Sequence, residues 1–332
     1  MEPTLSNRVR LTVAEARELA ADSLRRIGYD EEDARIVADH VLDAALCGYE
    51  YSGLPKILNL PEFSRGKQPR QPVRVLRETE VSALIDGGNN VGMLALYHAT
   101  RIAIDKAQAR GFALVGAYNA WMSGRSAYYM EMIARADLAG IHTAALPPLV
   151  APLGGIGRAL GTNPLALALP TAREPLILDI GTSAFMMTDL RFRERLGELL
   201  PEGVAIDPTG KPTRDPVQAR LGALLTFGGH RGYGLALMMQ AFGVLAGSAY
   251  GPGKEHGYLL IAFKPDLLLP LADFKREVSE LIDRIKATPR APGVEEIRIP
   301  SERAFRERAQ RLREGIEIDR KVFEALQTLG AT

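Results

Sequence analysis

The stretch LGGIGRALGTNPLALALPTAREPLILD, Leu153–Asp179, contains the signals that decide how this chain folds. Glycine lets the backbone adopt a positive φ and approach a neighbour closely. Four glycines stand among the first nine residues of the stretch: Gly154, Gly155, Gly157 and Gly161. Asn163-Pro164 follows, and a proline moves the residue before it out of the helical region. We therefore expect a glycine-rich loop that leads into two short buried strands, Leu165–Leu169 and Leu176–Ile180.

The glycine spacing invites comparison with a dinucleotide-binding fingerprint. Gly155-x-Gly157-x-x-x-Gly161 is similar to that pattern, but the fingerprint requires a strand before it and a helix after it. Here the loop leads into a strand. The sequence therefore excludes a Rossmann fold.

Helices and strands alternate on both sides of this stretch. Thr12-x-x-Glu15 is a capping box that predicts a helix ending at Gly28, and Asp30 begins a second helix that ends at Gly48. Asp86–Gly92 is a cluster of turn residues before a third helix, which ends at Gly111. Further helices are expected around Tyr129–Leu138, Leu190–Leu200, Leu235–Ala246, Asp273–Ala287 and Glu302–Gly315, and strands at Phe112–Tyr118, Ile141–Leu146, Tyr258–Phe263 and Glu296–Ile299. This alternation indicates an α/β core.

Composition limits the classes of function. The 332 residues carry 41 basic and 40 acidic side chains, so no overall field favours nucleic acid or an anionic membrane. Cys47 is the only cysteine, which excludes an internal disulfide and a cysteine-cluster metal site. The longest apolar run, Leu235–Ala246, is far shorter than the roughly 20 residues of a membrane span. We expect a cytoplasmic protein that acts on a small molecule, without a metal site.

Two polar segments are chemically suggestive. Gly48–Lys56 brings together a phenol, a carboxylate, a hydroxyl and an ammonium group, although an ordinary turn between helices fits these residues equally well. The spacing from Tyr51 to Lys56 is one residue longer than the Tyr-x-x-x-Lys of short-chain dehydrogenases, and Pro55 breaks the helix, so that family is excluded. Gly228–Gly234 precedes a helix whose first amides, with Arg231, suit a phosphate. A solvated charge explains Arg231 as well. His40 lies beside an apolar helix face, and we expect it to be a packed or solvated histidine.

Four motifs together resemble the type 2 malate/L-lactate dehydrogenase family. They are LGTNP at Leu160–Pro164, Asp179-x-x-Thr182-Ser183, PEGxAxDxxGxPTxDP at Pro201–Pro216, and GGHRGYGLA at Gly228–Ala236. They occur in the family's order, and the match covers most of the chain. The family includes sulfolactate and ureidoglycolate dehydrogenases and piperideine-2-carboxylate reductases.

The resemblance implies a non-Rossmann NAD(P)-binding α/β fold, a nicotinamide cofactor, 2-oxo or cyclic 2-imino acid substrates, and a homodimer. We expect residues 1–75 to form an N-terminal helical subdomain, joined by the C-terminal helices 301–332. Residues 76–300 are then the cofactor-binding and substrate domain. By the same resemblance, the cofactor-binding residues are Met122, Ser123, Gly124, Thr162, Asn163, Asp179, Thr182, Ser183, His230, Arg231 and Gly232.

The sequence departs from the family where the family transfers a proton. The family's loop Gly-x-x-Ser-His-Gly-x-x-Arg, with a proton-donating histidine and a carboxylate-binding arginine, falls on Gly48–Lys56. Tyr51 then replaces the serine, Ser52 the histidine and Lys56 the arginine. In the later Ser-x-His-x-Gly loop, Met122 replaces the histidine, and Arg231 replaces the lysine of the last motif. The chain is thus expected to be a divergent member that lacks the catalytic histidine.

Two functions remain open. The first is an NAD(P)H-dependent oxidoreductase, with Tyr51, Ser52 and Lys56 as catalytic residues. Tyr51 donates the proton, and Lys56 lowers the pKa of Tyr51 or binds the substrate carboxylate. The second is a non-catalytic protein that binds a dinucleotide or metabolite. Arg125 and Arg158 are the candidate partners for the 2′-phosphate of NADPH.

Overall fold

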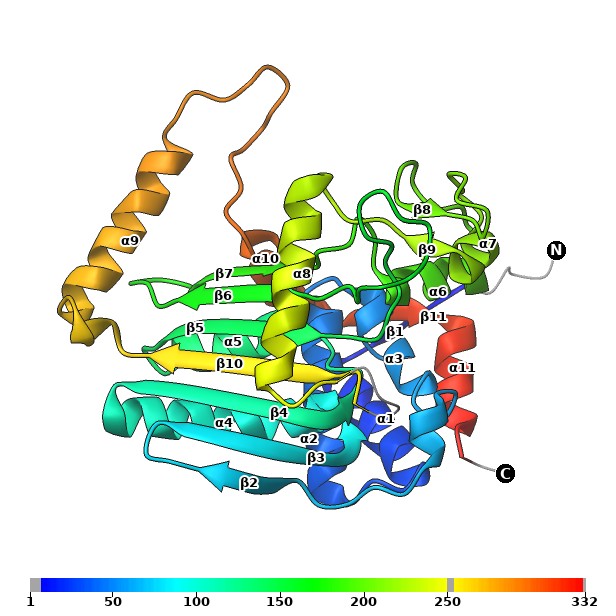
Figure 1. Ribbon diagram of the computed structural model, residues 1–332, viewed down its shortest axis with the longest axis horizontal. Coiled ribbons are helices and arrows are strands. Elements are labelled where there is room, and N and C mark those ends of the chain that lie inside the picture. Colours follow the sequence, from blue (N-terminus) through cyan, green and yellow to red (C-terminus); the bar gives the residue numbers. More distant parts are fainter. Residues whose placement is uncertain (1–6, 250–253, 331–332) are drawn as a thin grey trace.

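A seven-stranded sheet forms the centre of the molecule (Figure 1). The computed structural model describes residues 7–249 and 254–330. Among the strands of this sheet, β3 and β4 are the one parallel pair, and every other neighbouring pair is antiparallel. In spatial order the strands are β2 (Arg74–Glu78), β3 (Ser82–Val91), β4 (Phe112–Trp121), β10 (Gly257–Phe263), β5 (Ala139–Ala145), β6 (Leu165–Leu169) and β7 (Leu176–Ile180). A sheet of this kind is unlike the parallel sheet of a Rossmann fold.

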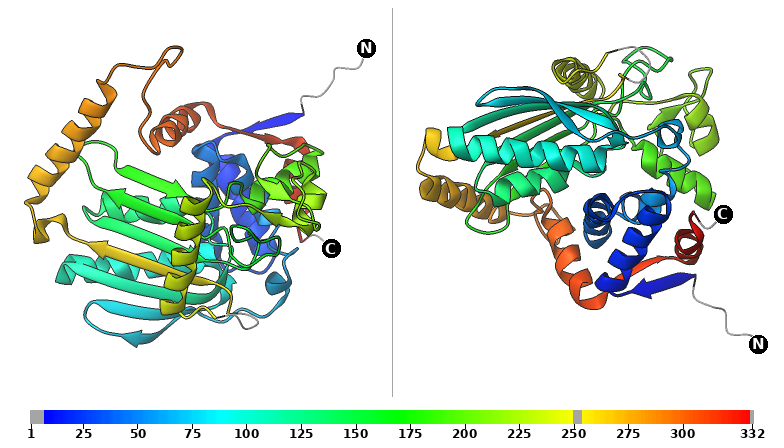
Figure 2. Two further views of the ribbon diagram at one scale, coloured as in Figure 1. Left: turned by 45° about the horizontal axis from the view of Figure 1, so that its top comes forward. Right: turned by 90° about the horizontal axis from the view of Figure 1, so that it is seen from below.

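Helices cover both faces of the sheet (Figure 2). Helices α4 (Gly92–Arg110) and α5 (Ser126–Arg135) pack on one face through a core that includes Ala99, Val115 and Ile133. Helix α8 (His230–Leu245) lies on the other face, against β5 and β10. Its Gly243 packs so closely that a Cβ there would lie 2.1 Å from Ala145 Cβ. Helix α9 (Leu271–Lys286) and the segment 287–300 extend away from this body (Figure 1).

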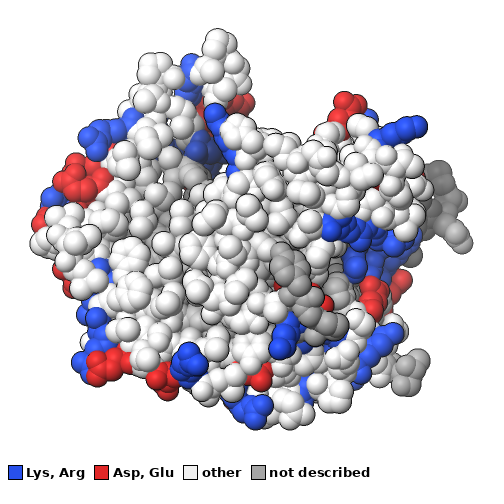
Figure 3. Space-filling view, viewed as in Figure 1, with Lys and Arg blue, Asp and Glu red and all other residues white. Residues whose placement is uncertain are grey.

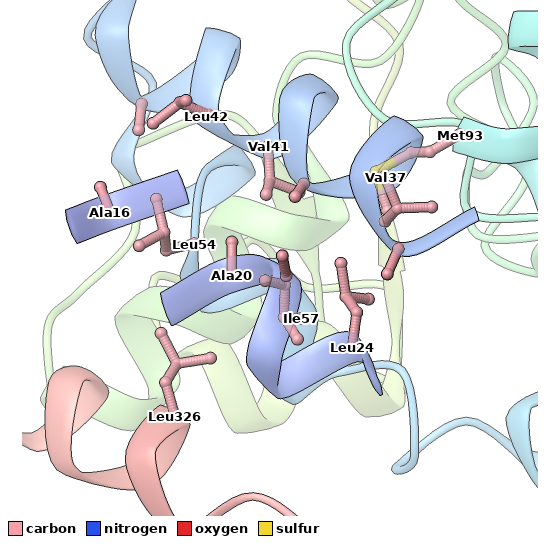
Figure 4. Close-up of a cluster of buried hydrophobic side chains, with 14 of the residues drawn as sticks. Ala16, Ala20, Leu24, Val37, Val41, Leu42, Leu54, Ile57, Met93 and Leu326 are labelled. Atoms are coloured by element: carbon pink, nitrogen blue, oxygen red, sulfur yellow. The ribbon is translucent and has the colours of Figure 1, made fainter. Parts of the chain in front are cut away.

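The two ends of the chain meet in a helical layer beside the sheet. Strand β1 (Arg8–Leu11) pairs with β11 (Ile316–Asp319), and α11 (Arg320–Thr328) packs against α1 (Val13–Arg26) and α3 (Pro55–Leu58). Helix α10 (Glu302–Glu314) lies against α2 (Glu31–Leu46). Figure 4 shows the core of this layer, in which Leu326 joins side chains of the first three helices and Met93 enters from α4.

A smaller third unit lies at one end of the sheet. It contains α6 (Met187–Leu196), α7 (Pro216–Leu221) and the short strands β8 (Ala205–Ile206) and β9 (Ala223–Leu224). Its own core includes Val150, Leu190 and Leu200. Of the helices described, none is both long and apolar enough to cross a membrane.

Most of the expected elements are present. The capping box at Thr12 forms as predicted, with Glu15 bonded back to the Thr12 amide, and β6 and β7 have the predicted bounds. The exceptions have physical reasons. Asp86–Gly92 is not a separate turn but the bulged end of β3, with Gly88 at φ +63° and Asn89 at φ +60°.

Helix boundaries account for the other differences. Helix α8 begins at His230, before the predicted Leu235, because positive φ values at Gly228 and Gly229 complete the turn earlier. Helix α6 begins at Met187 and ends at Leu196, where Gly197 adopts φ +72°. The predicted strand Glu296–Ile299 is irregular in the structure. Strands β1, β2, β3, β8, β9 and β11 were not predicted.

Candidate active site

Three of the four sequence motifs meet at the start of β6 and the end of β7. The Thr182 amide and hydroxyl donate to the Thr162 carbonyl at 2.9 and 3.1 Å, and the Phe227 amide donates to the Thr182 carbonyl at 3.2 Å. Ser183 pairs with Thr226 in an isolated bridge, and its hydroxyl donates to the Phe185 carbonyl at 2.7 Å. The loops around residues 162, 182 and 227 therefore form one backbone assembly next to the start of α8.

Asn163 fixes the position of α8. Its side-chain amide donates to the Ala236 carbonyl at 3.0 Å and to Gln240 Oε1 at 2.9 Å, and its Oδ1 accepts from the Leu146 amide at 3.0 Å. The residue is fully buried and has φ +31°, a region that asparagine tolerates better than most residues. Its polar side chain is thus used within the protein and positions the helix.

Asp179 holds the beginning of α5. Its Oδ2 accepts from the Ala127 amide at 2.8 Å. Burial raises the pKa of this carboxyl, while the Ala127 amide, the Arg125 charge and the Ser126 amide lower it by less. A carboxylate at this place also satisfies free amides of the helix N-terminus.

The start of α8 is open. Gly229 precedes the helix without a side-chain cap, and Gly228, Gly229, His230 and Arg231 are exposed. The Arg231 amide donates to the Gly228 carbonyl at 3.4 Å, and the Arg231 guanidinium group makes no hydrogen bond or ion pair with any residue of the described segments. A Cβ at Gly232 would lie 2.0 Å from the Phe227 carbonyl oxygen, so only glycine lets the loop and helix approach this closely. Free amides, the helix dipole and a guanidinium group together fit a phosphate, as a dinucleotide requires.

Lys56 is a buried residue of α3. Only 4 % of the residue is exposed, and its ammonium group makes no hydrogen bond or ion pair within residues 7–249 and 254–330. Burial lowers the pKa of Lys56 to about 8. Gly53 makes this possible, because a Cβ there would lie 2.9 Å from Ala45 Cβ, so the loop packs directly on α2. Nζ itself keeps some contact with solvent, because it is not among the fully buried polar atoms that lack a partner. An ammonium group desolvated to this degree without an acidic partner is still costly in free energy, which is typical of functional sites.

His40 lies close enough to Lys56 for the lysine charge to act on its pKa, and it also packs against the loop at Ala120–Gly124. Its Nε2 accepts from the Arg125 amide at 2.9 Å, so the ring proton lies on Nδ1, which has no partner in the described structure. Burial, and then the positive charges of Lys56 and Arg125, hold the pKa of His40 well below its usual value. His40 is therefore packed and neutral, in agreement with the packed alternative of the sequence prediction.

The loop against His40 has an unusual backbone. A Cβ at Gly124, which has φ +78°, would lie 2.0 Å from His40 Nε2. Met122 has φ +59°, a conformation that costs free energy in a residue other than glycine. The Ser123 carbonyl accepts from the Tyr129 hydroxyl at 2.5 Å. Such local strain is often found at functional sites.

Tyr51 does not have the predicted pKa. Burial and the charge of Asp189, followed by smaller contributions that include Asp179, raise its pKa to about 12. The expectation that Lys56 lowers the pKa of Tyr51 is therefore wrong, because loss of solvation and nearby carboxylates dominate. Ser52 beside it is buried.

Both arginines proposed for the 2′-phosphate have internal partners. Arg125 pairs with Asp43, and only 8 % of its side chain is exposed. Arg158 donates to the Gly222 carbonyl at 2.6 Å and to the Arg220 carbonyl. Both guanidinium groups thus already have partners within the protein, and their contact with a 2′-phosphate stays a prediction. No hydrogen bond or ion pair within the described ranges joins Arg231 or His230 to Lys56.

Comparison with known proteins shows which proteins this chain is similar to. The sequence profile described as malate/L-lactate dehydrogenase matches residues 11–327. The chain belongs to this family. It is 33 % identical to the malate/(S)-sulfolactate dehydrogenase of Methanothermus fervidus, over 95 % of this chain and 95 % of that protein. The family resemblance and the non-Rossmann α/β fold expected from the sequence are confirmed.

Two solved structures extend the comparison. Malate dehydrogenase from Pyrococcus horikoshii OT3 has a TM-score of 0.88 and 32 % identity, over 100 % of this chain and 97 % of that chain. The δ1-piperideine-2-carboxylate reductase of Pseudomonas syringae has a TM-score of 0.83 and 28 % identity, over 97 % and 99 %. The chain is thus a member of an oxidoreductase family that acts on small molecules. No group of three or more histidine, cysteine or acidic side chains within the residues described could hold a metal ion.

Proposed function

We propose that this protein is an NAD(P)H-dependent oxidoreductase that transfers a hydride between nicotinamide and a 2-oxo acid or cyclic 2-imino acid. The observation that carries the proposal is the buried Lys56 ammonium without an acidic partner, in the fold of an oxidoreductase family. A substrate carboxylate supplies the missing negative charge. The relatives named above act on malate, sulfolactate and piperideine-2-carboxylate, and each of these compounds carries a carboxylate.

The residues at the start of α8 support the cofactor. The exposed amides after Gly229 and the side chain of Arg231 bind a phosphate, and Gly232 allows close approach of the loop. Thr162, Thr182 and Ser183 form the neighbouring wall, while Asn163 and Asp179 position α8 and α5. The bound nicotinamide supplies the hydride, and the protein supplies orientation and a proton.

The site lies between two parts of the chain. We propose the division into a helical part, residues 1–75 with 301–332, and an α/β part, residues 76–300. His40 and Lys56 come from the helical part, and the start of α8 comes from the other. The pairing of β1 with β11 supports the grouping of residues 1–75 with residues 301–332 in the helical part.

The test is binding followed by turnover. Fluorescence titration with NADH and NADPH is expected to give a micromolar dissociation constant, on the order of −8 kcal/mol. Oxidation of the bound cofactor is then measured against a panel of 2-oxo acids, with and without amines. Absence of binding at millimolar concentration contradicts the proposal. Binding without turnover indicates the alternative, a non-catalytic dinucleotide-binding protein.

We also propose a homodimer that covers the outer face of α8. Leu237, Met238, Val244 and Leu245 are each about half or more exposed there, at 49, 52, 61 and 66 %. Figure 3 shows few charged side chains over this face of the molecule. Apolar patches of this kind are typical of protein interfaces. Light scattering is expected to give the dimer mass, and Leu245→Lys to lower it. Leu199→Lys, at another exposed leucine, serves as control.

A further inference from the structure

We propose that one group, the Lys56 ammonium, both binds the carboxylate of a 2-oxo acid and donates the proton to its keto oxygen. This inference rests on the proposed function and deepens it. In this proposal Lys56, and not Tyr51, is the proton donor. It concerns the oxo acids only, because an iminium substrate already carries its proton.

The surroundings of Lys56 leave its N–H groups available. The residue is 4 % exposed, and its ammonium has no acceptor among the described residues. The carboxylates near the site already have partners: Asp43 is paired with Arg125 and Arg308, Glu50 with Arg8 and Asp189 with Arg193, and Asp179 accepts the Ala127 amide. An ammonium has three donors and no acceptor. A bound anion is therefore the partner that completes this site.

The other nearby side chains are poorer acids. His40 is neutral, and its Nε2 already accepts the Arg125 amide. Ser52 and Met122 supply no acid that is useful at neutral pH. The pKa of Tyr51 is raised to about 12, whereas that of Lys56 is lowered to about 8. A general acid is most effective when its pKa lies near the working pH.

The shape of a 2-oxo acid permits the double role. Its carboxylate and keto groups are on adjacent carbons, so one carboxylate oxygen and the keto oxygen can point to the same side. A single ammonium can donate to both. Arginine at this position would bind the carboxylate but could not give up its proton, because its pKa exceeds 12.

The reaction balances with this one group. As the hydride supplied by the reduced cofactor adds to C2, the π pair of the C=O bond moves to oxygen. The oxygen takes the proton from Nζ, giving the hydroxy acid and a neutral amine. Burial stabilises that neutral amine. Solvent then restores the proton. In the oxidative direction the neutral amine accepts the hydroxyl proton.

The direction of the pH dependence follows. Reduction requires the charged form and falls as the pH rises past about 8, whereas oxidation requires the neutral form and rises there. The titratable or charged groups in this region are His40 and Asp43 on α2, Tyr51 in the preceding turn, and Arg125. Tyr49, Asp179, Asp189 and Arg303 act on Tyr51 from the neighbouring elements. Helices α1 and α11 contribute apolar side chains to the core around α3, such as Leu24 and Leu326 (Figure 4).

Lys56→Arg separates binding from proton donation. With the protein saturated in NADH or NADPH, whichever binds, we measure calorimetrically the affinity for oxamate, a non-reducible analogue of a 2-oxo acid. Lys56→Arg is expected to keep oxamate affinity within about tenfold but to lower kcat about 10²- to 10⁴-fold and remove the inflection of kcat/KM near pH 8. Lys56→Met loses oxamate binding as well. Lys106→Arg, at an ammonium paired with Glu78 outside the site, changes neither quantity.

A second readout uses the unsubstituted protein. At pH 8.5 oxamate binding is expected to take up a fraction of a proton, measured by calorimetry in buffers of different ionisation enthalpy, and to protect Lys56 from acetylation. Lys56→Arg takes up no proton. A Lys56→Arg enzyme with the parent kcat and pH profile overturns this inference and leaves the proposed function intact, as does binding without proton uptake or protection. If the unsubstituted protein binds no nicotinamide cofactor or reduces no 2-oxo acid, both are overturned.

Discussion

At the scale of single residues, Lys56 is costly to the fold. Its pKa falls from 10.5 to about 8, because burial favours the neutral amine. At neutral pH this shift corresponds to on the order of 3 kcal/mol of lost stability. Between pH 8 and 10.5 the unfolded chain binds more protons than the folded one, so folding stability is expected to rise with pH in that window.

Lys56→Met is therefore expected to stabilise the protein at pH 7 while abolishing its activity. The gain in the free energy of unfolding is about 1–3 kcal/mol and shrinks as the pH rises from about 8 to 10.5, as measured by denaturant unfolding at several pH values. Lys106→Met, which removes a paired lysine with a 13 % exposed side chain, gives no such gain. Equal stability of Lys56→Met and the parent at pH 7 would indicate that the ammonium is already satisfied.

Gly124 permits the contact between His40 and the strained loop. Gly124→Ala adds a Cβ 2.0 Å from His40 Nε2 and also requires alanine at φ +78°. Gly197→Ala is the matched control, because Gly197 has φ +72° but nothing within 4 Å of the added Cβ. The control is expected to cost about 1–2 kcal/mol of unfolding free energy, and Gly124→Ala clearly more. If thermal denaturation shows the same loss of unfolding free energy for both variants, the close approach of Gly124 to His40 does not contribute to stability.

At the scale of elements, the start of α8 is the proposed phosphate site. Arg231→Ala is expected to weaken cofactor binding about tenfold, because one charge-assisted hydrogen bond to phosphate is lost. The catalytic rate at saturating cofactor changes little. Arg101→Ala, at an exposed arginine on α4 across the sheet, is the control. Fluorescence titration measures both dissociation constants, and an unchanged value for Arg231→Ala shows that this residue is a surface charge.

Local signals explain which elements could be predicted. The capping box at Thr12 and the proline after Asn163 act within a few residues, so the first helix and strand β6 follow from the sequence. Strands β1 and β11 carry no comparable signal, because each exists through pairing with the other end of the chain. The glycines before His230 were read as a loop. Only their φ values determine where the helix begins.

The candidate site, too, could be predicted only in part. The motifs predicted which loops meet at Thr162 and Thr182, since those motifs resemble a known family. They could not predict that Lys56 lacks an acidic partner or that Arg125 is bound to Asp43. Those facts depend on the packing of α2, α3 and the loop after β4. The pKa of Tyr51 likewise depends on burial and on Asp189, which is remote in the sequence.

At the scale of the whole molecule, a buried ionic network ties α10 to α2 and α5. Arg308 pairs with Glu131 at 2.6 Å and with Asp43 at 2.9 Å, and the side chains of all three are less than one-fifth exposed. Burial raises the pKa of Glu131, but the hydrogen bonds and charges of Arg308 and Arg135 outweigh this and lower it overall. The network thus joins α10 to α2, which carries His40, and to α5, whose first turn is held by Asp179.

Arg308→Leu is expected to lower the free energy of unfolding at pH 7 by about 3–5 kcal/mol, because two largely buried carboxylates lose a shared cation. The depressed pKa of Glu131 contributes stability above its ordinary value of 4.5, and this contribution is lost as the pH falls. The difference between Arg308→Leu and the parent therefore shrinks below about pH 4.5. Arg306→Leu removes an arginine of the same helix, exposed at 52 % and paired with Glu296, and is expected to lower the stability much less, because solvent screens an exposed ion pair. Denaturant unfolding at pH 7 and pH 4 measures all three proteins. Similar losses for the two variants, or a loss for Arg308→Leu that does not depend on pH, contradict a role for the buried charges.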